Sequence, residues 1–432
     1  MLEPLVADIP LRVEAVLATE LSGFGMRPDM SDTLVVAISQ SGTTTDTNRT
    51  VDLARGRGAH LIAIVNRRNS DLTDKVDGVL YTSDGRDVEM AVPSTKAFYS
   101  QVAAGVLLAV AIAESAGAKA VSDAERRELL RALRALPEAM AEVVGRREHI
   151  GRIAAEVAPS RRYWALVGNG TNRIAAQELR IKLSELCYKS IACDVTEDKK
   201  HIDLSAEPLI LVCAAGLSGS TADDVAKEVA IYRAHKAAPV VIGTDGEGRF
   251  GAALHLITVP ATHPQLAFVL SAMAGHLFGY EAAHSIDRQA TPLRLARSAI
   301  EEQVSAGASG GEALLGLLRP KLVGPAGTFF DGLRAGDYDG HLEASTASRL
   351  ASLLRYSQGM ASLDAYQAEH GKVGTPAVVI DDLTAGLTRA IEELTRPIDA
   401  IKHQAKTVTV GISRTDETLL QVPLVQAVLA AG

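Results

Sequence analysis

The sequence predicts an α/β protein built from two doubly wound parallel sheets, each in a three-layer αβα arrangement. Runs of β-branched and aliphatic residues are followed directly by small-residue loops and helical stretches, the pattern of buried parallel strands that feed helices. This strand–loop–helix alternation occurs twice along the chain, as in a weak internal repeat. The 432 residues suffice for two or three domains of ordinary size.

The first unit is expected to contain three strands and one long helix. Residues 33–39 (TLVVAIS), 60–65 (HLIAIV) and 78–81 (GVLY) are predicted strands, and residues 94–113 are a predicted helix. The most apolar run, residues 102–113, is too short to span a bilayer, so we expect a buried helix there. An Ala-, Arg-, Glu- and Leu-rich stretch, residues 118–160, is interpreted as a helical connection at a domain boundary.

The second unit repeats the alternation over a longer stretch. Strands are expected at residues 163–167, 208–214, 239–243 and 256–259, and helices at 172–189 and 221–235. The glycine-containing residues 301–395 that follow are interpreted as an inserted or appended module of helices and loops. The predicted domains are therefore residues 1–142, 143–300, 301–395 and a terminal segment 396–432.

Composition and charge exclude several functions. A net charge of −8 argues against sequence-independent binding of nucleic acid, because such binding needs a clustered basic face. Cys187, Cys193 and Cys213 have neither metal-type spacing nor an even-numbered disulfide set, so reduced thiols are expected. Neither a metal nor another cofactor is expected. The acidic, proline-containing start does not look like a secretory signal, and a cytoplasmic protein without membrane partners is predicted.

The loop from Ser39 through Gln40, Ser41 and Gly42 to Thr44 lies where a predicted strand ends and a helix begins. Ligands of parallel sheets bind at the carboxyl ends of strands, and a helix N-terminus offers free N–H groups to an anion. A hydroxyl here can also be a simple helix N-cap. Four hydroxyls together with a glycine and a glutamine favour a phosphate site.

Two further clusters are candidates. Val92 to Lys96 opens the long helix of the first unit, and Val92 or Ser94 could meet sugar hydroxyls through backbone groups, although a helix cap explains Ser94 equally well. In the second unit Glu178, Lys182 and Glu185 share one helical face at i, i+4 and i+7. Such a stripe is usually solvated, yet a positioned carboxylate beside a lysine can also move protons.

Residues 38–47 (ISQSGTTTDT) and 89–98 (EMAVPSTKAF) are similar to two motifs of the isomerase half of the glutamine–fructose-6-phosphate aminotransferase family. The resemblance covers about residues 8–300 and 396–411, and it implies two sugar-isomerase (SIS) domains of flavodoxin-like fold. Residues 9–16 resemble the segment that follows the family's first strand and loop. The resemblance therefore implies that the first domain lacks its initial strand–helix unit and leaves a strand edge uncovered.

The resemblance also assigns roles to single residues. Residues 178–185 (ELRIKLSE) are similar to the family's catalytic helix, which implies Glu185 as the proton carrier, Lys182 as its helper and Glu178 among the substrate-binding residues. His201 matches a histidine that assists ring opening from a neighbouring subunit, which implies a homodimer. Ile202 and Asp203 replace the family's Gly-Pro after it, so this loop is open to a different fold.

The lysine that forms a Schiff base in the family has two competing positions here. Residues 399–410 (DAIKHQAKTVTV) match the family's tail motif and imply Lys406, whereas Arg297 stands where that tail would follow the second domain and cannot form an imine. We interpret residues 301–395 as an insertion before the tail. Because residue 2 is Leu and no glutaminase half is visible, ammonia would have to come from another source.

The implied function is conversion of fructose 6-phosphate and ammonia to glucosamine 6-phosphate. The main alternative is a non-catalytic SIS module that binds or senses a hexose phosphate. A dinucleotide-binding oxidoreductase would rest on Gly168-Asn169-Gly170 after a strand, but the third glycine of that fingerprint is missing.

Overall fold

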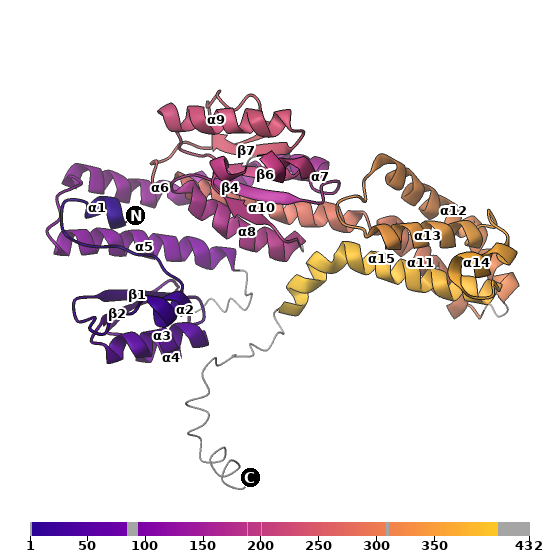
Figure 1. Cartoon of the computed structure of the whole chain (residues 1–432), viewed down its shortest axis with the longest axis horizontal. Coiled ribbons are helices and arrows are strands. Elements are labelled where there is room, and N and C mark those ends of the chain that lie inside the picture. The colour runs from indigo at the N-terminus through magenta and orange to yellow at the C-terminus, as the bar shows by residue number, and fades with distance from the viewer. Residues whose placement is uncertain (1, 84–93, 188, 200, 308–310, 405–432) are drawn as a thin grey trace, which may run out of the picture. The chain divides into compact units, whose positions relative to one another are not determined.

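The computed structural model describes residues 2–83, 94–187, 189–199, 201–307 and 311–404 (Figure 1). Contacts between residues divide the chain into two compact units, one up to Leu133 and one from Arg134 to Gln404. Helix α6 (Asp123–Gly145) crosses this boundary. The two units are described separately.

The first unit contains a parallel sheet in the order β1-β2-β3, formed by β1 (Leu34–Ser39), β2 (His60–Val65) and β3 (Gly78–Tyr81). All three predicted strands are confirmed. Helices α3 (Thr45–Gly56) and α4 (Asp71–Asp74) connect them. The core between helix and sheet is aliphatic, with Val51, Leu61 and Leu72 almost fully buried. This core fixes the carboxyl end of β1, where the candidate phosphate loop begins.

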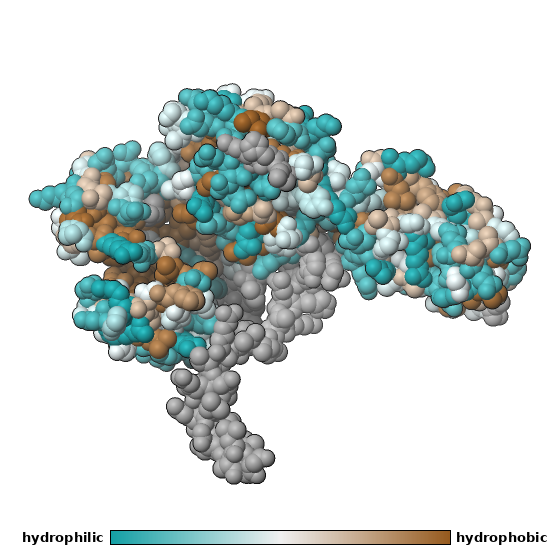
Figure 2. All heavy atoms as spheres, in the orientation of Figure 1, coloured by the Kyte–Doolittle hydropathy of each residue, from teal (hydrophilic) through white to brown (hydrophobic). Residues whose placement is uncertain are grey.

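Strand β1 is an edge strand, since β2 is its one partner within the described part of the chain. Leu34 and Ile38 on β1 are 41% and 56% exposed. Figure 2 shows hydrophobic residues at the surface of this unit, over β1 and α5. The expected uncovered strand edge is therefore present among the residues that the structure describes.

Helix α5 (Thr95–Ser115) confirms the predicted long helix but corrects its predicted burial. It packs on α1 (Leu2–Leu5) and on β2, and only one stripe is buried, at Val106, Ala109, Val110 and Ala113. Leu107, on the other side, is 51% exposed. Among the described residues α5 is the one helix long and apolar enough to cross a bilayer by length and composition, with 28% of its apolar window buried.

The remaining short helices of the first unit are α2 (Ala18–Glu20) and the π-helix η1 (Leu21–Gly25), both of which contact α3. Thr50 of α3 donates a hydrogen bond from its hydroxyl to the Ala18 carbonyl at 2.8 Å. The segment before β1 is thereby tied to the helix that follows the candidate phosphate loop.

The second unit contains a five-stranded parallel sheet in the order β5-β4-β6-β7-β8. Its strands are β4 (Trp164–Gly168), β5 (Ala192–Asp194), β6 (Leu209–Cys213), β7 (Ala238–Thr244) and β8 (His255–Val259). The second strand along the chain lies on one side of the first and the third on the other, which is the flavodoxin-like order. The predicted fold class is confirmed, and the short strand β5 is the one strand of this sheet that the sequence did not predict.

Helices cover both faces of this sheet: α7 (Arg147–Val157), α8 (Asn172–Cys187), α9 (Gly219–Ala234) and α10 (Ala267–Arg288) (Figure 1). The short 3-10 helices η2 (Thr196–Asp198) and η3 (His201–Ala206) follow β5. The core on one face includes Val167, Ile210 and Val225. Cys187 and Cys213 are buried free thiols and Cys193 is half-buried, as expected.

The chain continues into a helical part that has its own core. Its elements are α11 (Thr291–Ser305), α12 (Gly311–Ala335), α13 (Ala344–Ser357), η4 (Leu363–Ala365), α14 (Tyr366–His370) and α15 (Pro376–Gln404). Leu293, Leu318, Leu353 and Leu387 from four of these helices meet in one buried cluster. The predicted limits at residues 300 and 395 fall inside α11 and α15.

Candidate functional site

The loop from Ser39 to Thr44 is held by its own hydrogen bonds. The Gly42 amide donates to Ser39 Oγ at 3.0 Å, and the Thr43 amide donates to Ser41 Oγ at 3.2 Å. Gly42 has φ +66°, and a Cβ there would lie 2.0 Å from Ser70 Oγ. Only glycine fits this left-handed turn against Ser70.

The start of α3 bears directly on the helix-cap alternative. Thr44 is the N-cap residue, but its hydroxyl makes no capping hydrogen bond and the residue is exposed. Gln40 has a buried Oε1 without a hydrogen-bond partner among the described residues. Buried polar atoms are nearly always paired, so this oxygen and the uncapped helix start suit a polar ligand better than a purely structural loop.

The second cluster of the first unit is described in part. Ser94 is buried, and its Oγ accepts a hydrogen bond from the Ala97 amide at 3.0 Å as the N-cap of α5. The helix-cap interpretation therefore holds for its side chain. Val92 lies outside the described residues.

In the second unit glycines bring α8 and α10 unusually close together. A Cβ on Gly275 would lie 2.2 Å from Leu179 Cδ1, and a Cβ on Gly279 would lie 2.8 Å from Leu183 Cδ1. The register is fixed near the start of α8, where Ser271 donates from its hydroxyl to Asn172 Oδ1 at 2.8 Å. Polar side chains on the facing stripes of α8 and α10 are consequently forced into contact.

Three of these side chains form a buried cluster, and Glu185 extends it at a half-buried position one turn along α8. Lys182 Nζ and His276 Nε2 each lie 3.4 Å from Glu178 Oε1, and the side chains of Glu178, Lys182 and His276 are 12%, 9% and 8% exposed. Glu185 follows on the same helix and has a buried Oε2 with no hydrogen-bond partner in the described part of the chain. The predicted stripe is therefore not a solvated face.

The two glutamates of this cluster titrate differently. Burial raises the pKa of Glu185, which the nearby charge of Lys182 offsets only in part. Burial would also raise the pKa of Glu178, but the contact with His276 and the charge of Lys182 together bring it below its ordinary value. A carboxyl group with a raised pKa beside an ionised one suits the two halves of a proton transfer.

The other predicted catalytic residues are less completely placed. His201 begins η3, and the described structure does not extend to its side chain. Lys406 lies outside the described residues. Arg297 lies on α11, with its Nε 3.3 Å from Glu301 Oε1 as an ordinary helical ion pair.

The Gly168-Asn169-Gly170 turn has a structural role. Asn169 Nδ2 donates to Thr196 Oγ1 at 2.8 Å, and a Cβ on Gly168 would lie 2.4 Å from the Asn172 carbonyl oxygen. The turn closes β4 onto α8 without the third glycine of a dinucleotide site. Within the described ranges there is also no group of three His, Cys, Asp or Glu side chains placed to hold a metal ion.

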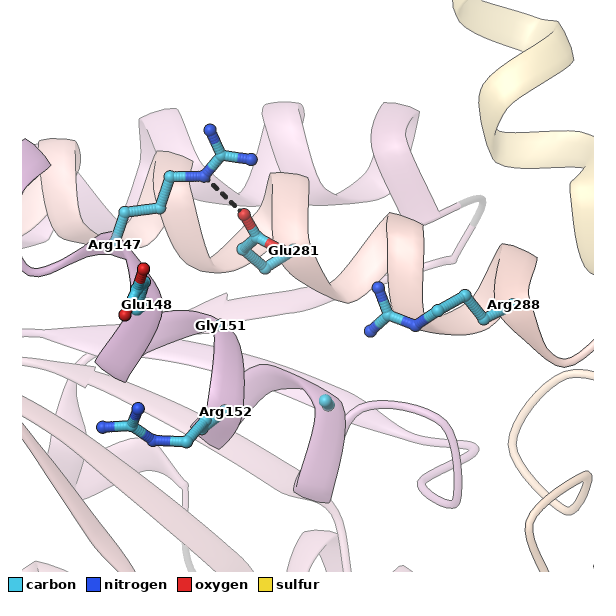
Figure 3. A pocket seen from close by; sticks show the side chains of 7 residues that line it. Arg147, Glu148, Gly151, Arg152, Glu281 and Arg288 are labelled. Atoms are coloured by element: carbon cyan, nitrogen blue, oxygen red, sulfur yellow. Dashed lines mark hydrogen bonds and ion pairs between the residues drawn. The ribbon is translucent and has the colours of Figure 1, made fainter.

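A separate hollow of about 580 Å³ lies between α7 and α10 (Figure 3). Arg147, Arg152 and Arg288 line it together with Glu148 and Glu281, and Arg147 Nε donates to Glu281 Oε1 at 2.6 Å. All three arginines are exposed. None of the predicted site residues lines this hollow, which is a solvated patch of mixed charge.

One domain model and several curated proteins are similar to parts of this chain. Residues 13–111 match the model of the SIS domain. The glutamine–fructose-6-phosphate aminotransferase (isomerizing) of Thermus thermophilus is 34% identical over 276 residues, which cover 63% of this chain and 45% of that protein. The enzymes of the same name from Halobacterium salinarum and Mycobacterium tuberculosis are 33% and 32% identical over 304 residues, 68% of this chain. The chain thus spans about half the length of these relatives.

Solved structures show the same fold. The C-terminal domain of glucosamine-fructose-6-phosphate aminotransferase from Francisella tularensis superposes with a TM-score of 0.57 at 22% identity, covering 66% of this chain and 79% of that chain. A phosphosugar isomerase structure from Silicibacter pomeroyi gives a TM-score of 0.53 at 22% identity, with coverages of 66% and 80%. The resemblance of the sequence to the isomerase half of this family is confirmed.

Proposed function

We propose that this chain, a SIS-domain homologue of the isomerase half of the glutamine–fructose-6-phosphate aminotransferases, forms glucosamine 6-phosphate from fructose 6-phosphate and ammonia. As the resemblance implies, the proposal assigns phosphate binding to the Ser39–Thr44 loop and proton transfer to Glu185 and Lys182 of α8. Its ammonia would come from outside this chain. A homodimer, implied by the resemblance, and a cytoplasmic location, expected from the composition and the N-terminal sequence, stay predictions.

The loop supports phosphate binding through donors that are not otherwise used. The Thr44 hydroxyl is free of a capping role, and the N-terminus of the 12-residue helix α3 presents backbone N–H groups and a positive dipole end. Ser39 and Ser41 accept hydrogen bonds from the Gly42 and Thr43 amides, and these contacts leave their own O–H groups able to donate. We therefore assign phosphate contacts to the Ser39, Ser41 and Thr44 hydroxyls, with Gln40 facing a sugar hydroxyl.

The chemical step is a proton transfer between neighbouring carbons. After ring opening, assigned to His201, the C2 carbonyl condenses with the Lys406 amine and loses water, and ammonia then displaces the lysine to leave a C2 imine. Glu185 removes a proton from C1 while the imine nitrogen takes up a proton, which gives an enamine. Glu185 then returns its proton to C2 while the C1 hydroxyl releases its proton, which leaves an aldehyde at C1 and an amine at C2. The Lys182 ammonium stabilises negative charge that develops in this step.

The single observation that carries this proposal is that, within the described ranges, Glu185 has an unpaired carboxylate oxygen in a partly buried position. Its Oε2 is buried without a protein partner among the described residues, and its pKa is raised. A structural carboxylate with a buried oxygen would normally be paired, because buried polar atoms almost always have a hydrogen-bond partner. Unsatisfied carboxyl groups with a perturbed pKa concentrate at functional sites.

Calorimetry with the full chain tests the binding half of the proposal. Glucosamine 6-phosphate is expected to bind, and glucosamine without its phosphate is not. Thr44→Val removes one hydroxyl at constant size, and losing a hydrogen bond to a charged group should weaken binding about 10-fold or more. Ser31→Ala removes an exposed hydroxyl before the opposite end of β1 and is the matched control.

Two outcomes would redirect the proposal. An absence of binding at millimolar glucosamine 6-phosphate contradicts a sugar-phosphate site in this chain. Binding without any turnover of fructose 6-phosphate and ammonia favours the alternative, a SIS module that binds or senses a hexose phosphate. The exposed edge of β1 is the structural feature on which that alternative rests.

A further inference from the structure

His276 belongs to the charged cluster although its sequence context is that of an ordinary core residue. It follows Gly275 directly in the apolar helix α10, and it is 8% exposed. Its Nε2 lies 3.4 Å from Glu178 Oε1. The contact exists because Gly275 and Gly279 let α10 approach the Leu179 and Leu183 side chains of α8.

Glu178 Oε1 lies between two nitrogen atoms at ion-pair distance, although neither contact has hydrogen-bond geometry. His276 approaches it from α10 and Lys182 from the next turn of α8, both at 3.4 Å. A buried carboxylate held by a single lysine draws that lysine toward itself, because each group is the other's main compensation for lost water. The ring of His276 at 3.4 Å is a second group that compensates the Glu178 carboxylate, so Glu178 depends less on Lys182.

Glu185 depends on the same lysine. The charge of Lys182 is the one effect that lowers the pKa of Glu185, whereas burial and the charge of Glu178 raise it. The two glutamates of α8 therefore compete for one ammonium group. A side chain of another helix that contacts Glu178 therefore affects how strongly the Lys182 ammonium group interacts with Glu185.

We propose that His276 is a positioning residue that holds the Glu178 carboxylate from α10 and so frees Lys182 to act on Glu185 and the reacting sugar. Nε2 donates in the neutral Nε2–H tautomer and in the protonated ring, so the contact persists in both states. His276 itself does not touch the sugar in this assignment. The effect of His276 on catalysis rests on the proposed function, whereas the contact between His276 and Glu178 does not.

A matched pair of substitutions separates the donor from the space that the ring fills. A glutamine places its amide nitrogen near the position of Nε2, whereas an asparagine is too short for its amide to reach Glu178. His276→Gln should therefore keep the contact and His276→Asn should lose it, although both side chains are polar amides. His284→Asn is the control. His284 lies on the same helix but packs edge-on against Tyr280, with the two ring centroids 4.4 Å apart.

The first readout requires no activity. In the full chain with 13C-labelled glutamate carboxyl groups, the Glu178 resonance is assigned by its loss in Glu178→Gln and followed through a pH titration by NMR. His276→Asn should move the Glu178 midpoint to higher pH, because a donor to the ionised form is lost. His276→Gln and His284→Asn should leave it within a few tenths of a unit of the wild type.

The second readout is turnover of fructose 6-phosphate with ammonia. His276→Asn should lower kcat about 10-fold or more with KM nearly unchanged, since the residue supports the proton transfer and does not bind substrate. His276→Gln should restore most of kcat. A purely packing role would instead make the asparagine and glutamine variants equally defective.

The proposal is overturned if the Glu178 midpoint in folded His276→Asn equals that of the wild type, or if glutamine fails to restore it. An inactive wild-type protein would refute the proposed function, and the titration would still decide whether His276 holds Glu178. If His276→Asn does not fold, His276→Gln with a wild-type midpoint supports the donor role and with a raised midpoint contradicts it.

Discussion

Gly275→Ala tests whether the close approach of α8 and α10 depends on the missing side chain. The new Cβ would lie 2.2 and 2.5 Å from Leu179 Cδ1 and Cδ2 and 2.9 Å from its Cγ, where contacts near 4 Å are normal. Leu179 is fully buried, so it cannot turn out to solvent. The helices must move apart or Leu179 must leave its rotamer.

The expected loss combines two opposing terms. Overpacking a core by one methyl group costs about 1–3 kcal/mol, and the higher helix propensity of alanine returns about 1 kcal/mol. With an overlap this close to the leucine branch point we expect the upper end of the range, so a net loss of about 2 kcal/mol. Gly316→Ala on α12, where a Cβ meets nothing within 4 Å, should instead stabilise by about 0.5–1 kcal/mol.

The single tryptophan of the chain makes the assay specific. Trp164 is buried in β4 of the second unit, so its fluorescence in urea reports the unfolding of that unit alone. Leu179→Ala alone should cost about 2–5 kcal/mol, and in the Gly275→Ala background its cost should shrink by at least about 1 kcal/mol. Additive losses, or a neutral Gly275→Ala, would refute the packing argument.

Three further predictions concern the loop, the proton carrier and a buried lysine. Gly42→Ala, with φ +66° and Ser70 in the way, should cost about 1–3 kcal/mol and weaken glucosamine 6-phosphate binding in calorimetry. Glu185→Gln should raise the free energy of unfolding at pH 7 by up to about 1 kcal/mol, because it removes a buried ionised group whose folded pKa is raised. That gain should shrink as the pH falls through the ordinary carboxyl range and vanish near about pH 3, where Glu185 is protonated in both the folded and the unfolded state. Lys189→Met should cost about 2 kcal/mol in urea unfolding, because Lys189 Nζ donates to three backbone carbonyls at 2.9–3.0 Å.

Each of these predictions has a result that would contradict it, and two of the substitutions have a matched control. Gly56→Ala in α3 meets nothing within 4 Å and should leave binding unchanged, so equal effects of Gly42→Ala and Gly56→Ala would count against a strained loop. A clear loss of stability in Glu185→Gln at pH 7 would mean that the carboxylate is structurally paired. Lys227→Met removes an exposed ammonium and should be nearly neutral, and a similarly small effect of Lys189→Met would show that its three hydrogen bonds contribute little.

Much of the fold followed from local patterns in the sequence. The strands at 33–39, 60–65 and 208–214 are continuous β-branched and aliphatic runs, and such runs are buried in parallel sheets whatever their surroundings. Strand β5 (Ala192–Asp194) has only three residues and no such run, so its pairing with β4 is set by the sheet and not by its own sequence. The partial burial of α5 was likewise not predictable, because it depends on what packs on the helix.

The candidate site shows the same limit. Spacing alone places Glu178, Lys182 and Glu185 on one face of α8, but not whether that face is buried or solvated. The partner that distinguishes the two, His276, comes from another helix almost a hundred residues later. The spacing of Gly275 and Gly279 in an apolar helix was the one local sign that another helix approaches closely there.

The most direct test of the account is hydrogen exchange at the reacting carbons. With the full chain in D2O, proton NMR of fructose 6-phosphate with an ammonium salt should show loss of the C1 proton signal as Glu185 exchanges with solvent. Glu185→Gln should slow this exchange at least about 100-fold while glucosamine 6-phosphate binding persists. Exchange at the wild-type rate in Glu185→Gln, or no exchange by a wild-type protein that binds the sugar phosphate, would contradict the assignment of Glu185 as the proton carrier.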